Sequence, residues 1–219
     1  MLVIIASKHQ KQASQAGFTV LELMVATTIF AIVLLVLTVG VLSFSRDYFS
    51  SVNRSNTQTV ARAIIDDIAK TIQFSSASLT TGDQGATSAR CIDNVQYLYA
   101  PGYEVSDTAN LSTHKSKYGL IKRVSSSACG GVDLISSYAF SASQDKELLG
   151  KNMRISALSI TSTGDHVFTI HVRVAFGDDD LFTNLDPTDW SKMKCRSGAG
   201  SQFCAVSDLS TTVQQRIRN

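Results

Sequence analysis

The sequence predicts an α+β protein in which one long N-terminal helix is followed by a head built on an antiparallel β-sheet. Residues 23–45 carry no charged side chain, and apolar residues then recur at helical spacing as far as Phe74. Beyond Cys91 the apolar residues fall at every second position instead. That change of period is typical of a passage from helix to strands with one buried face.

Length and charge set the first bounds on function. At 219 residues the chain suits one head domain and an anchor. The only charged residues among the first 17 are Lys8 and Lys11, so a chain that begins at Phe18 has 18 basic and 18 acidic side chains. Balanced charge argues against a broad surface for polyanions. We therefore predict no specific nucleic-acid partner.

The charge-free run predicts a membrane span with one acid at its start. As a helix, 23 residues extend far enough to cross ~30 Å of hydrocarbon. Glu22 stands directly before this run. A carboxylate in such a place costs free energy and usually has a function and a partner. The alternative is a plain signal anchor that happens to contain an acid.

The residues around Glu22 form a specific motif. Gln15-Ala16-Gly17 precedes Phe18-Thr19-Val20-Leu21-Glu22 and the apolar run. This segment resembles the prepilin cleavage and methylation segment of type IV pilins and type II secretion pseudopilins. The resemblance implies cleavage between Gly17 and Phe18 by a membrane aspartyl prepilin peptidase, and N-methylation of Phe18. It also implies that Glu22 pairs with the N-terminal amine of a neighbouring subunit during assembly.

The same resemblance implies partners and a location. The partners are prepilin peptidase, other pilin or pseudopilin subunits, an inner-membrane assembly platform and, before assembly, membrane lipid. The location is the cytoplasmic (inner) membrane, crossed once with the head outside. After assembly it is an extracellular pilus or a periplasmic pseudopilus.

The expected organisation has four parts. Residues 1–17 form a leader peptide, which opens with more apolar residues than prepilin leaders usually do. Residues 18–45 form the transmembrane and filament-core half of the helix, and residues 46–74 its amphipathic half. In that second half Val60, Ile64, Ile68 and Ile72 recur every fourth position, with Ala61 and Ile65 beside them. We expect this face to pack against the head.

Residues 75–219 form the β-rich head with a C-terminal disulfide loop. Residues 75–90 are rich in Ser, Thr, Gly and Ala, which predicts a loop. Strands are expected at residues 95–99, 118–124, 132–135, 153–160 and 167–176, with a last one near Val213. In residues 167–176 strict alternation predicts one face of Phe168, Ile170, Val172, Val174 and Phe176. A helix covered by an antiparallel sheet is also what the pilin resemblance implies.

All four cysteines follow the span. An even number in a chain that crosses a membrane predicts two disulfides in an oxidising compartment. Three connectivities are open. The spacing favours a short loop closed by Cys195 and Cys204, which leaves Cys91 with Cys129. The spacing fits no compact zinc site.

An acidic segment after residue 176 is the one candidate ligand site in the head. Five carboxylates lie within twelve residues: Asp178, Asp179, Asp180, Asp186 and Asp189. Calcium takes six to eight oxygen ligands, which a flexible loop can supply, and the resemblance adds that some pseudopilins bind calcium in their heads. The alternative is a solvated turn whose acids point into water.

No catalytic motif is present. The sequence has no Ser-His-Asp order, no glycine-rich phosphate loop and no His-Glu-x-x-His pattern, and we predict no enzymatic activity. The layout most resembles minor pilins and the J-type minor pseudopilin. It implies a minor type IV pilin-like structural subunit in the priming, assembly or tip of a pilus. The alternatives are a type II secretion minor pseudopilin and an adhesive or DNA-binding module displayed by a filament.

Overall fold

The computed structural model describes residues 17–75, 79–84, 87–107, 110, 112, 114–124, 145–164 and 166–216. The chain divides into two compact units, residues 1–45 and residues 46–219. The boundary coincides with the end of the charge-free run at Ser45. Each unit is described by itself below.

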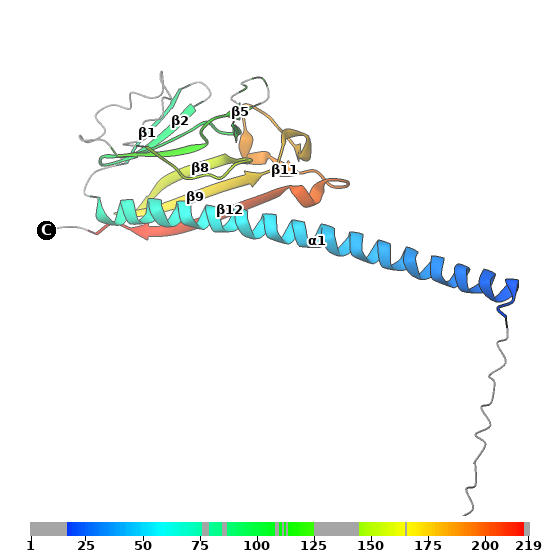
Figure 1. Ribbon diagram of the computed structural model, residues 1–219. Coiled ribbons are helices and arrows are strands. Elements are labelled where there is room, and N and C mark those ends of the chain that lie inside the picture. Colours follow the sequence, from blue (N-terminus) through cyan, green and yellow to red (C-terminus); the bar gives the residue numbers. More distant parts are fainter. Residues whose placement is uncertain are drawn as a thin grey trace, which may run out of the picture. The chain divides into compact units, whose positions relative to one another are not determined.

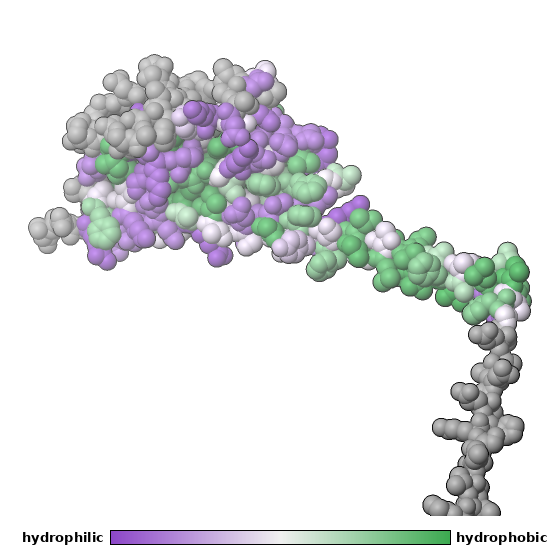
Figure 2. Space-filling model, in the orientation of Figure 1, coloured by the Kyte–Doolittle hydropathy of each residue, from purple (hydrophilic) through white to green (hydrophobic). Residues whose placement is uncertain are grey.

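The first unit is the beginning of helix α1, which covers Val20–Phe74. Its apolar window is long enough to cross a membrane by length and composition, and none of that window is buried within the described residues. Figure 2 shows the apolar side chains on the surface of this stretch. Three threonine hydroxyls donate back to helix carbonyls: Thr27 to Met24, Thr28 to Met24 and Thr38 to Leu34. These polar groups are therefore already satisfied for a lipid environment.

The second unit begins with the remainder of α1, which packs on the head along one face. The buried residues of the helix are Thr57, Ala61, Ile64, Ile65, Ile68 and Ile72. The predicted isoleucine face is therefore confirmed. Each fully buried isoleucine contributes about 1.5–3 kcal/mol of transfer free energy, so this face holds the helix to the sheets.

A five-stranded antiparallel sheet has the order β1-β2-β3-β6-β7. Its strands are β1 (Leu79–Gln84), β2 (Thr87–Ile92), β3 (Val95–Tyr99), β6 (Leu120–Val124) and β7 (Asp145–Glu147). The expected strand at residues 95–99 is confirmed, and β6 occupies most of the expected strand at 118–124.

The loop expected at residues 75–90 is wrong. β1 and β2 pair as a hairpin, and β2 pairs in turn with β3 from Ser88↔Tyr99 to Ile92↔Val95. Small polar residues hide the strand signal in the sequence. The neighbouring strand β3 supplies the backbone partners that decide the conformation of β2, and β2 does the same for β1.

A three-stranded sheet with the order β12-β9-β8 faces the helix (Figure 1). β8 covers Met153–Gly164, β9 Val167–Phe176 and β12 Ala205–Gln214. Ile170, Val172 and Val174 of β9 are fully buried on the predicted face. β8 runs four residues beyond its expected end because its pairing with β9 continues to Gly164↔Val167. Val213 lies in β12, which confirms the last strand.

Short elements complete the described head. β4 (Glu104–Val105) pairs with β5 (Lys115–Ser116) in parallel, and β10 (Phe182–Thr183) pairs with β11 (Lys194–Cys195) in antiparallel. Three short 3-10 helices are η2 (Asp179–Leu181), η3 (Trp190–Lys192) and η4 (Ser201–Phe203). The strand expected at residues 132–135 lies outside the described residues.

One hydrophobic core joins α1 to both large sheets. It contains Ile64 and Ile68 of the helix, Tyr97 of β3, and Ile170 and Val172 of β9. The Tyr97 hydroxyl reaches back to the helix, where it donates to Asp67 at 2.8 Å. The isoleucine face of α1 and the apolar face of β9 therefore bury each other in the same core.

A buried arginine of β8, Arg154, contacts four residues of two other segments. The Arg154 guanidinium is fully buried. Its Nη2 donates to Glu104 Oε2 and to the Gly177 carbonyl, both at 2.8 Å. Its Nη1 donates to Asp179 and, at 3.2 Å, to the Gly102 carbonyl. One side chain therefore fixes β4, β8 and the start of the acidic segment together.

The acid opposite Arg154 depends on this contact. Burial raises the pKa of Glu104 above its ordinary value, and the positive charges of Arg154 and Lys115 oppose that rise. Lys115 lies at 3.9 Å and is the weaker partner. Without Arg154 the carboxylate is left in a buried position with little compensation.

We expect Arg154→Met to lower the free energy of unfolding by about 3–5 kcal/mol, because it leaves Glu104 buried without its partner. The loss is expected to shrink as the pH falls, since protonation removes the unpaired charge. Denaturant titration of the full chain in detergent measures both effects. Adding Glu104→Gln to Arg154→Met is expected to restore part of the stability.

The matched control is Lys151→Met, which removes the exposed ion pair between Lys151 and Asp107. Exposed pairs add little to stability, so its unfolding midpoint is expected to equal that of the unsubstituted chain. An Arg154→Met midpoint equal to that of the control would contradict the role of the buried arginine.

Candidate functional site

The candidate site is the beginning of α1, where Thr19 precedes the first helical residue, Val20. The Glu22 amide donates to Thr19 Oγ1 at 3.2 Å. In return, Glu22 Oε2 accepts hydrogen bonds from the Thr19 amide and from Thr19 Oγ1, each at 3.2 Å. This reciprocal arrangement is a capping box, which satisfies donors that the first turn of a helix leaves unpaired.

The capping box gives Glu22 a local role that the sequence analysis missed. The signal was available, because Thr-x-x-Glu before an apolar run is the sequence pattern of such a box. A carboxylate in the first turn also interacts favourably with the helix dipole. Glu22 therefore stabilises the start of its own helix in the single chain.

Only Glu22 Oε2 is used in this box. Within the described part of the chain, Oε1 accepts no hydrogen bond. Each carboxylate oxygen has two acceptor sites. Glu22 can therefore accept a further donor from outside the chain while it continues to cap the helix.

The predicted cleavage point lies just before the capped turn. Gly17 and Phe18 precede the helix, and the Phe18 side chain is 82% exposed. A Cβ atom added at Gly17 would meet no atom within 4 Å. Packing among the described residues therefore does not explain why glycine stands there.

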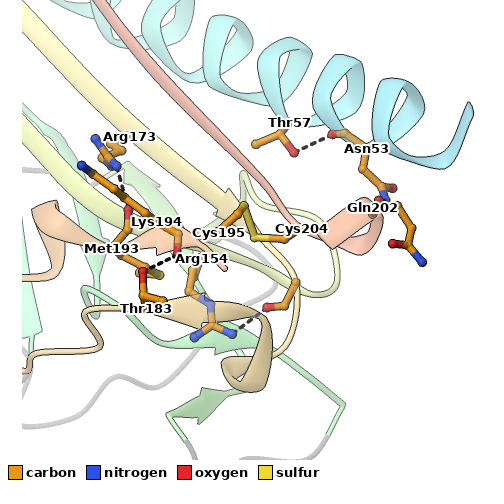
Figure 3. Close-up of a disulfide and its surroundings, with 11 residues drawn as sticks. Asn53, Thr57, Arg154, Arg173, Thr183, Met193, Lys194, Cys195, Gln202 and Cys204 are labelled. Atoms are coloured by element: carbon orange, nitrogen blue, oxygen red, sulfur yellow. Dashed lines mark hydrogen bonds between the residues drawn. A yellow bond between two sulfur atoms is a disulfide. The ribbon is translucent and has the colours of Figure 1, made fainter. Parts of the chain in front are cut away.

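The expected disulfide between Cys195 and Cys204 is present, with a Cα–Cα distance of 5.7 Å. Figure 3 shows it beside α1, where Asn53 Nδ2 donates to the Gln202 carbonyl at 2.9 Å. The disulfide loop is thereby attached to the helix. Cys91 is also in a disulfide. The expected partner, Cys129, lies outside the described residues, so that pairing stays a prediction.

The first acids of the acidic segment contact basic residues of other segments. Asp179 contacts Arg154, and its Oδ2 lies 3.4 Å from His114 Nδ1. Asp178 Oδ1 lies 3.8 Å from Lys115 Nζ. These carboxylates are therefore compensated by side chains of the head. Asp180 lies beside them in η2.

The later acids of the segment close turns. Asp186 accepts hydrogen bonds from the amide and hydroxyl of Thr188 at 2.8 and 2.7 Å, which lower its pKa. Asp189 caps η3 through the Ser191 amide at 3.2 Å, and the Ser191 hydroxyl bond is the first cause of its lowered pKa. Among the described residues no three metal-ligating side chains converge. Calcium binding by Asp178, Asp179, Asp180, Asp186 and Asp189 stays a prediction.

A cleft of about 550 Å³ lies between β8 and η3 and was not predicted. Tyr103, His114 and Trp190 contribute aromatic walls, with the His114 and Trp190 ring centroids 5.0 Å apart. Trp190 lies over Gly102, where an added Cβ would approach the indole to 2.2 Å. Glycine at this turn is therefore required by the tryptophan. Arg90 adds a charged group to the wall.

Comparison with known families locates the motif. Residues 12–38 match the family model described as the prokaryotic N-terminal methylation motif. Comparison with curated proteins and with solved structures gives no match. The matched residues include Gly17, Phe18 and the capping box. The chain thus carries the N-terminal methylation motif, consistent with the prepilin segment of a type IV pilin or pseudopilin, and the α+β architecture of its head agrees with that resemblance.

Proposed function

We propose that the protein is a minor type IV pilin-like structural subunit, processed by prepilin peptidase, that takes part in the priming, assembly or tip of a pilus filament. One observation carries this proposal. The methylation motif at residues 12–38 leads directly into an apolar helical stretch that nothing in the described chain covers. A processing motif followed by an uncovered apolar helix is what we expect of a subunit that assembles through this helix.

The uncovered stretch limits the environments in which the protein is stable. Burial of apolar surface is worth about 25 cal/mol per Å², so exposure of this helix to water is strongly unfavourable. Membrane lipid covers it before assembly, and the helices of other subunits cover it afterwards. These two environments correspond to the proposed locations, the inner membrane and then the filament.

Glu22 is the proposed assembly contact. Its uncommitted oxygen, Oε1, is available for a cation, and an unpaired carboxylate in a low-dielectric surrounding is costly. The methylated amine of Phe18 on a neighbouring subunit is such a cation. In this proposal, Thr19 holds the carboxylate in place while the second subunit binds.

The alternative as a type II secretion minor pseudopilin is supported by the same observation, because both classes share the processed segment. The adhesive alternative is favoured by a separate observation, the aromatic cleft between β8 and η3. A ligand of the head would bind there. The genes that flank this one distinguish a pilus from a secretion system.

Co-expression with a prepilin peptidase is expected to remove residues 1–17 and to leave a methyl group on the Phe18 amine. Mass spectrometry of the N-terminal peptide measures both changes. Gly17→Val is expected to block cleavage without affecting the fold, since a Cβ at Gly17 meets no atom of the described residues within 4 Å. Gly40→Ala, at a second glycine with open surroundings, is the control and is expected to be processed. If the unsubstituted chain keeps its leader under these conditions, the proposal is wrong.

Glu22→Val is expected to insert into the membrane as well as the unsubstituted chain and to be recovered less in filaments. A loss of about tenfold or more is expected, because 1.4 kcal/mol of lost pairing already gives a factor of ten. The ratio of subunit in sheared filaments to subunit in membranes measures it. Thr27→Val, which removes a hydroxyl bonded within the helix, is the control. Equal ratios for Glu22→Val and the control would count against the assembly contact.

A further inference from the structure

Exposed apolar side chains in the second unit concentrate at one place. Six large apolar residues are exposed among its described residues: Tyr48, Phe49, Val52, Phe74, Val124 and Phe203. Four of them lie on two segments in contact, residues 48–52 of α1 and the disulfide loop. The Phe49 ring centroid lies 5.8 Å from that of Phe203 and 5.9 Å from that of Tyr48. Val52 lies on the same helix face as these residues. We call Tyr48, Phe49, Val52 and Phe203 the aromatic cluster.

The loop that presents Phe203 is attached at two points and begins with a tight turn. Cys204, the next residue, is buried and bonded to Cys195. The Gln202 carbonyl accepts the hydrogen bond from Asn53 of α1 (Figure 3). Gly200 adopts φ 88°, which begins the turn into η4. The fixed loop thus holds Phe203 at the surface, where it extends the aromatic cluster, and contiguous exposed apolar side chains mark an interaction surface.

Chain position identifies that partner. Tyr48 and Phe49 follow the end of the charge-free run at Ser45 by three and four residues, about 4.5–6 Å along a helix. The headgroup layer of a bilayer begins at the edge of its hydrocarbon and is about 5–7 Å thick on each side. Aromatic side chains accumulate in that layer. Phe203 contacts Phe49, so we assign its side chain to the same headgroup layer.

We propose that the aromatic cluster is a lipid-docking site, which seats the head of the unassembled subunit in the headgroup layer of the bilayer that its helix crosses. The proposal rests on the membrane insertion that the proposed function includes. The helix supplies the first attachment, and the disulfide loop supplies a second one through Phe203. A docked loop restrains the head on the membrane surface.

The test uses the full chain in liposomes that contain phosphatidylcholine brominated near the headgroup end of its acyl chains. Phe203→Trp places a fluorophore in the aromatic cluster, and the unsubstituted chain gives the background of Trp190, the single native tryptophan. The matched control is Val124→Trp, at a residue of β6 that is 48% exposed, against 46% for Phe203. Circular dichroism checks that each variant is folded.

The added emission of Phe203→Trp is expected to fall by about half on bromination, and that of Val124→Trp to change by about a tenth or less, because only the first residue lies among lipid. In the double variant Cys195→Ser, Cys204→Ser, the quenching of Phe203→Trp is expected to fall, since the loop is then no longer closed.

Three other outcomes overturn the proposal, and they differ from one another. If the chain floats with liposomes and resists alkaline extraction but Phe203→Trp is quenched no more than Val124→Trp, insertion holds and docking is wrong. If quenching appears only when the ratio of protein to lipid is raised, the cluster contacts a second copy of the chain instead. A chain that does not float at all contradicts the proposed function as well.

Discussion

The isoleucine face of α1 is the contact on which the head depends. Ile64, Ile68 and Ile72 are buried against both large sheets, and each sheet buries one face in return. Because this contact is confined to the second half of the helix, the first half is left without cover from the described chain. The same helix therefore provides a stable domain and an apolar segment that requires another molecule. This division is the physical basis of the proposed function.

Arg154 in the head and Glu22 at the start of α1 are subject to the same constraint. A charged group that is removed from water needs a partner. Arg154 obtains Glu104 and Asp179 from within the head. Glu22 is only partly satisfied by Thr19, and one of its oxygens takes no hydrogen bond in the described chain. Both terminal nitrogens of the Arg154 guanidinium thus have their partners inside the head. The incomplete set at the helix start is what an assembly contact requires.

Local signals made much of the fold predictable. The charge-free run and the isoleucine spacing gave α1 almost to the residue, and alternation gave β9. The hairpin of β1 and β2 was missed because its strands depend on pairing with β3 rather than on their own composition. The two acidic partners of Arg154, Glu104 and Asp179, lie 50 and 25 residues away in the sequence. No local sequence pattern could therefore predict these contacts. The same holds for the acidic segment, whose Asp179 is engaged by a distant strand.

Photo-crosslinking from the middle of the uncovered helix identifies the molecule that covers it. A variant with a photoreactive residue in place of the exposed Leu34 is expressed in cells with and without the filament assembly machinery. If the protein is a filament subunit, we expect crosslinks to the apolar N-terminal helix of another subunit when the machinery is present, and crosslinks to lipid alone when it is absent. The same residue in place of the buried Ile68 is the control. Crosslinks from Leu34 to lipid alone under both conditions would contradict the account.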